Sequence, residues 1–179
     1  MKKITLLFCI FFATVATAQD KLMSTSGIVQ FEASIPLFEE VKAINKKVNC
    51  ILIERNNELT CSMFIKDFYF ERSLMQDHFN AYYMESDQYP KALFKGKIEK
   101  LNLNKSNDVP KTYLISGNIT IHGTTKKINC LASIKKTDQK VTLIATFVID
   151  TADFEIEIPS VVAPKIAKKV QVTLNCVLQ

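Results

Sequence analysis

The chain has 179 residues, of which 47% are hydrophobic and none is tryptophan, and its formal net charge is +5. Its lysines are spread along the sequence instead of forming one basic face, so we expect no nucleic-acid binding. Glycine is scarce, while Ile, Val, Phe and Thr are plentiful, and this composition favours strands over helices.

The N-terminus reads as a targeting signal. Lys2 and Lys3 precede an apolar run over 4–15, and Ala16-Thr17-Ala18 forms an A-x-A cleavage site. We therefore predict a signal peptide over 1–18 and a mature domain over 19–179, whose charge is +3 after the loss of Lys2 and Lys3 from a total of +5. The apolar run is shorter than the roughly 20 residues needed to span a bilayer. No cysteine directly follows the cleavage site, so we expect no stable membrane anchor.

The first half of the mature chain predicts three strands, over 22–33, 48–54 and 59–66. We expect an irregular or helical crossing over 37–45, and a turn at Asn56-Asn57 between the second and third strands. Residues 73–84 change to helical spacing, in which Met75, Phe79, Tyr82 and Tyr83 follow the pattern i, i+4, i+7 and i+8. Ser73 followed by Gln76 is a capping-box pattern, so we predict one short amphipathic helix here.

The second half predicts five further strands, over 92–98, 113–122, 127–135, 141–149 and 169–178. Gly96 suggests a bulge or a close backbone approach. A hairpin turn is expected at His122-Gly123-Thr124, and a long connection over 155–166. Eight short strands joined by hairpins form a sheet, which must cover its apolar face and its two edge strands. Closure into an antiparallel barrel does both, and eight strands leave room for one small ligand.

Three segments in one order carry a family resemblance. The hairpin segment 116–127 reads SGNITIHGTTKK. One upstream segment, made of His78-Phe79 and residues 89–96, precedes it, and segment 153–156 follows it. Together they resemble the YceI-like family of periplasmic polyisoprenoid-binding proteins. The resemblance implies an eight-stranded lipocalin-like barrel with a lipid along its interior. Thr151 and Glu155 replace the Arg and Gly of the family's R-x-D-(F/W)-G block, a departure that bears on the ligand and leaves the fold intact.

Four cysteines remain after cleavage of the signal peptide: Cys50, Cys61, Cys130 and Cys176. All four fall in phase with apolar neighbours, so we favour small buried hydrophobic side chains. The alternative is a Cys50–Cys61 disulfide across a hairpin, which an exported compartment would permit. The spacing of cysteine and histidine does not suggest zinc.

Catalytic signals are weak. The chain has two histidines, His78 and His122, and it lacks a GxSxG, P-loop or HExxH motif. For His122 we favour a structural role, capping the hairpin through backbone carbonyls, over contact with a ligand. His78 is also more easily explained as structural, although a place at a cavity entrance stays open. We expect no enzyme, metal or cofactor.

We therefore expect a non-catalytic periplasmic or secreted carrier or store of an amphiphilic lipid, such as a polyisoprenoid, an isoprenoid quinone or a fatty-acyl compound. The alternative is a stress-response or protein-interaction domain without lipid, which a filled barrel interior would favour. A homodimer is one oligomeric state that we consider. The expected tail contacts are Phe31, Phe64, Phe79, Tyr82, Phe94, Ile119, Ile121 and Phe147, and the expected headgroup contacts are His78 and Lys126.

Overall fold

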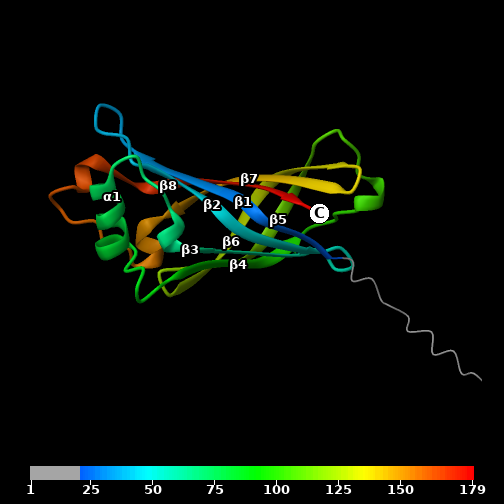
Figure 1. Ribbon diagram of the computed structural model, residues 1–179, viewed down its shortest axis with the longest axis horizontal. Coiled ribbons are helices and arrows are strands. Elements are labelled where there is room, and N and C mark those ends of the chain that lie inside the picture. Colours follow the sequence, from blue (N-terminus) through cyan, green and yellow to red (C-terminus); the bar gives the residue numbers. More distant parts are fainter. Residues whose placement is uncertain (1–20) are drawn as a thin grey trace, which may run out of the picture.

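Eight antiparallel strands close into a barrel in the order of the sequence, with β8 returning to pair with β1 (Figure 1). The computed structural model describes residues 21–179, so the predicted signal peptide lies outside the described residues. The closed all-β barrel confirms the predicted fold class. No helix in the described part of the chain is long and apolar enough to cross a membrane. The strands are β1 (Lys21–Ser34), β2 (Lys42–Ile53), β3 (Glu58–Phe64), β4 (Lys91–Ile98), β5 (Lys111–Ile121), β6 (Thr124–Thr137), β7 (Lys140–Asp150) and β8 (Ile166–Leu178).

The crossing that we predicted over 37–45 is wrong in its second half, because β2 already begins at Lys42. The polar Asn45 lies within this strand, and its side chain is fully buried. Its amide nitrogen donates to the Phe64 carbonyl at 2.9 Å, and its oxygen accepts from the Lys47 amide at 2.8 Å. A buried polar side chain is tolerated in a strand when its hydrogen bonds are made in this way.

The predicted helix is present, as α1 (Ser73–His78) followed by the wider π-helical turns of η2 (Phe79–Tyr83). The predicted capping box is wrong, because the N-cap is Arg72 and no side chain caps it. The Gln76 side chain instead accepts from the Phe70 amide at 3.2 Å, tying the helix to the segment before it. The helix covers one end of the barrel, and the C-terminus lies towards the other (Figure 1).

The predicted hairpin turn lies between β5 and β6. His122 and Gly123 have φ angles of 49° and 74°, the paired positive values of a type I′ turn. A Cβ on Gly123 would lie 2.7 Å from the Tyr89 ring, so this position also lacks space. The His122 ring donates to the Phe154 carbonyl at 3.1 Å and meets the Glu85 carboxylate at 3.0 Å. His122 therefore has a structural role. It holds the hairpin to η4, through Phe154, and to the loop after η2, through Glu85.

The remaining short helices are η1 (Ile65–Asp67), η3 (Leu103–Lys105), η4 (Thr151–Phe154) and η5 (Ala163–Lys165). At the end near the C-terminus, η3 and the residues before it contribute Leu101 and Leu103 to the core. There they join fully buried side chains from the strand ends, among them Leu52, Leu143 and Leu178. This half of the barrel is filled with side chains.

The cysteines lie in the barrel as small apolar side chains. Cys50 and Cys61 face each other across β2 and β3, with their sulfurs 2.7 Å apart, and Cys176 is buried beside them. All four described cysteines are free thiols in this structure. A hydrogen bond with Cys50, together with burial, raises the pKa of Cys176, and burial raises the pKa of Cys130. Thiols of this kind stay protonated and react slowly near neutral pH.

Candidate functional site

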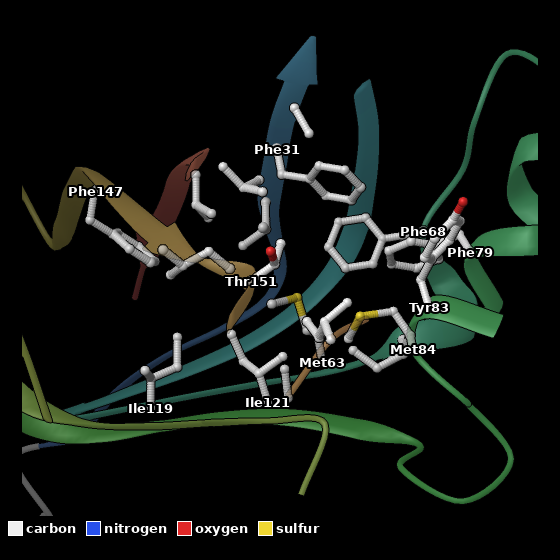
Figure 2. A pocket seen from close by; sticks show the side chains of 18 of the residues that line it. Phe31, Met63, Phe68, Phe79, Tyr83, Met84, Ile119, Ile121, Phe147 and Thr151 are labelled. Carbon is white, nitrogen blue, oxygen red and sulfur yellow. The ribbon is translucent and has the colours of Figure 1, made fainter. Parts of the chain in front are cut away.

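An apolar cavity of about 380 Å³ occupies the half of the barrel next to α1 (Figure 2). Its volume is within the range of sites that hold a small molecule. The strands supply most of its wall. Side chains alternate between the two faces of a strand, and those that point inward line the cavity. The lining includes Val29, Phe31, Met63, Phe94, Ile119, Ile121, Ile128, Cys130, Ala145, Phe147, Ile149, Val170, Val172 and Leu174.

The cavity ends where the filled half begins. Val48, Leu59 and Ile115 line its inner end, and each is at most 2% exposed. Neighbouring buried residues further towards the C-terminal end, such as Leu52 and Leu143, do not line it. An apolar tail can therefore enter about half of the barrel before it meets packed side chains.

Phe94 is held flat against the wall by a pair of glycines. Gly96 on β4 and Gly117 on β5 are cross-strand partners. A Cβ on either would lie 2.6 or 2.7 Å from the end of the Phe94 ring, closer than real Cβ contacts allow. The close backbone approach predicted at Gly96 is thus confirmed. Its effect on the site is that the Phe94 ring occupies the space above the glycines instead of crossing the cavity.

Four phenylalanines form an aromatic cluster between β1 and α1. The Phe31 ring lies 5.2 Å from Phe68, 5.8 Å from Phe70 and 5.5 Å from Phe79, measured between ring centroids. Figure 2 shows the rings of Phe31, Phe68 and Phe79 on one side of the cavity. Edge and offset contacts of this kind hold aromatic rings in fixed orientations. The cluster gives the cavity a rigid wall close to the helix.

Polar groups are few and lie towards the helix end. Thr151, in η4, is buried, and its hydroxyl points into the cavity (Figure 2). His78, Glu39 and Lys165 also line the cavity and are exposed to solvent. Glu39 forms an ion pair with Arg72. The cavity therefore opens at this end, and its chemistry suits a long apolar group with a polar end near the opening.

The structure brings most of the predicted contacts together. Six of the eight predicted tail contacts line the cavity, as does one of the two predicted headgroup contacts. Those that line it are Phe31, Phe79, Phe94, Ile119, Ile121, Phe147 and His78.

Three predicted contacts lie elsewhere. Phe64 is 48% exposed on the outer wall, with the Lys91 ammonium 4.8 Å from its ring centroid, because Met63 takes the inward position at the end of β3. Tyr82 is 72% exposed, since the helix turns Phe79 and Tyr83 inward instead. The Lys126 ammonium lies 3.7 Å from the Asp153 carboxylate and does not line the cavity.

Some lining residues were missed from the sequence. Ile156 and Ile158 come from the long connection before β8, and their two-residue spacing was a usable signal. Thr151 stood out in the sequence only as a departure from the family's block, and nothing local shows that its hydroxyl faces a cavity. Within residues 21–179, no three His, Cys, Asp or Glu side chains are grouped so that they could hold a metal ion.

The match to known proteins agrees with this geometry. The model of the YceI-like domain matches residues 15–178, and the chain therefore belongs to the YceI-like family. Among curated proteins, none matches the chain.

Solved structures share the fold at low sequence identity. A polyisoprenoid-binding domain from Saccharophagus degradans, implicated in plant cell wall breakdown, has a TM-score of 0.74 at 13% identity, covering 90% of this chain and 98% of that one. BcnA from Burkholderia cenocepacia has a TM-score of 0.65 at 14% identity, covering 86% and 96%. A YceI protein from Campylobacter jejuni has a TM-score of 0.61 at 16% identity, covering 80% and 86%.

Proposed function

We propose that this protein is an exported, non-catalytic carrier or store of an amphiphilic lipid: a polyisoprenoid, an isoprenoid quinone or a fatty-acyl compound. The observation that supports the proposal is the apolar cavity, which stays hollow although the rest of the barrel is packed. Burial of apolar carbon contributes about 0.8 kcal/mol per CH₂ group. A few isoprene units in the cavity would thus bind tightly without any ion pair.

The position of the polar groups orients the ligand. Its tail would run towards Ile115, Cys130 and Leu174, where the lining is apolar. Its polar end would lie near Thr151 and His78, where a hydroxyl and an imidazole can hydrogen-bond an oxygen. These groups would select among headgroups, while the tail supplies most of the affinity.

Extraction tests the ligand directly. Protein purified from its native host would be extracted with organic solvent and analysed by mass spectrometry. We expect a long-chain apolar molecule at close to one equivalent per chain. A consistently empty extract, together with failure to take up added geranylgeraniol, would support the alternative of a protein-interaction domain without lipid.

Export rests on the N-terminal sequence alone. The basic start, the apolar run and the A-x-A site would direct secretion and cleavage after Ala18. The intact mass of the protein recovered from the periplasm or the medium should correspond to a chain that begins at Gln19. Retention of the whole protein in the cytoplasm at its full-length mass would contradict export.

A further inference from the structure

Three segments frame the cavity opening: residues 35–41 between β1 and β2, residues 71–83 with α1 and η2, and residues 155–166 before β8. Figure 1 shows all three at the same end of the barrel. Each supplies lining side chains, for example Val41, Phe79 and Ile158. We call these three segments together the rim.

The rim also turns apolar side chains outward. Leu37 is fully exposed, Val161 is 83% exposed and Leu74 is 64% exposed. Phe38 and Tyr82 are exposed on the same segments. One exposed apolar side chain is ordinary, but a set on three segments around an apolar opening is typical of an interaction surface.

The charge of the rim differs from that of the whole chain. The rim contains six acidic side chains and two basic ones, whereas the mature chain has a formal net charge of +3, the total of +5 less Lys2 and Lys3. The acidic ones are Glu39, Glu40, Glu71, Asp77, Glu155 and Glu157, and the basic ones are Arg72 and Lys165. An acidic rim is repelled by an anionic surface and attracted to ammonium groups.

We propose that the rim docks on a zwitterionic bilayer rich in phosphatidylethanolamine. Leu37, Leu74 and Val161 enter the interface. The rim carboxylates outside the Glu39–Arg72 and Glu40–Lys42 ion pairs meet the ethanolamine ammonium groups. The inference rests on the proposed lipid ligand, because docking in this orientation lets an apolar tail pass between bilayer and cavity without crossing water. An anionic bilayer would instead attract the lysine-bearing walls and leave the opening in solvent.

Vesicle flotation of the mature chain tests the docking. The vesicles contain phosphatidylcholine and phosphatidylethanolamine, and the rim variant is Leu37→Ser with Val161→Ser. The matched control is Leu131→Ser with Val148→Ser on the outer wall, where these residues are 61% and 59% exposed. We expect the rim variant to bind vesicles at least roughly tenfold more weakly, and the control to bind like the wild-type protein.

Anionic lipid provides a second readout. Replacing part of the phosphatidylethanolamine with phosphatidylglycerol should weaken docking at low salt, and added salt should reduce that effect. The proposal is overturned if the wild-type protein ignores all vesicles, if both variants lose binding equally, or if phosphatidylglycerol strengthens rim-dependent binding. A wild-type protein that ignores vesicles would point to a protein partner at the rim.

Loading in solution separates the two proposals. Geranylgeraniol added from ethanol should load the wild-type protein and the rim variant equally, because the cavity is unchanged. If neither loads, the ligand proposal fails, and flotation still decides the docking. If both load, but the rim variant also takes the probe from vesicles at the wild-type rate, only the docking proposal fails.

Discussion

The two halves of the barrel share the same eight strands but differ in what fills them. Towards the C-terminus, large side chains such as Leu52, Ile98 and Leu143 meet in the middle, with Leu101 and Leu103 closing the end. Next to α1, the inward positions leave a cavity of about 380 Å³. Barrel closure removes the sheet edges in both halves, but it does not decide whether the interior is filled.

The difference comes from a few small side chains. Ala92 and Ala145 occupy inward positions of the hollow half, and Gly96 with Gly117 lets the Phe94 ring lie against the wall. The packed half contains most of the large side chains that are fully buried, whereas the hollow half has room for a ligand. The predictions below test this division, beginning with the largest expected effect.

Phe94→Asp should abolish loading of geranylgeraniol, a loss of more than about a hundredfold in affinity, because it places a carboxylate in an apolar cavity. The matched control is Phe64→Asp, which puts the same charge on the exposed outer wall of the neighbouring strand. Loading is measured by mass spectrometry after gel filtration, with circular dichroism to check folding. Equal loss in both variants would mean that Phe94 does not contact the ligand.

Leu143→Ala should lower the free energy of unfolding by about 2–5 kcal/mol, because it opens a void in packed surroundings. Ile119→Ala should cost less than about 2 kcal/mol in ligand-free protein, since this side chain already borders a cavity. Urea denaturation of both proteins provides the comparison. Similar losses would show that the two halves are equally packed in solution.

Cys130 should report on occupancy of the cavity. It lines the cavity and is half-buried. Cys61 also lines the cavity but is buried, as are Cys50 and Cys176. In native protein without ligand, N-ethylmaleimide should modify Cys130 first. Its rate should rise with pH because the thiolate is the reactive form, and the rise should extend to higher pH than for an exposed cysteine because burial raises the pKa of this thiol. Loading with geranylgeraniol should slow the reaction several-fold, as measured by peptide mass spectrometry. An unchanged rate in fully loaded protein would place the tail elsewhere.

Thr151→Val should have the smallest effect. It removes the hydroxyl that points into the cavity and keeps the shape of the side chain, at a cost of about 0.5–1.5 kcal/mol in affinity for a ligand with a hydrogen-bonding head. Binding of geranylgeraniol and of squalene, which lacks a polar head, would be compared by titration. Only geranylgeraniol should bind more weakly; an equal change for both would exclude a hydrogen bond.

Sequence patterns were most informative where the signal is local. Alternation predicted the strands of the second half, and Gly123 predicted the turn between β5 and β6. Phe64 was misplaced although parity gives its face correctly: it alternates with the inward-facing Cys61 and Met63 along β3 and so lies on the outer wall. Thr151 was noted as a departure from the family's block but not as a lining residue, because that role depends on the position of η4 against the barrel wall.

The sequence alone determined that the protein is all-β and in which order its strands follow one another. It also determined the short helix before β4 and the family resemblance. These depend on residue spacing and turn chemistry, which are properties of neighbouring residues. Only the tertiary structure decided that one half of the barrel is hollow, which aromatic rings face the cavity, and that the apolar tips of three segments meet around its opening. Those facts depend on contacts between residues far apart in the chain, such as Gly96 with Gly117, which spacing along one strand does not reveal.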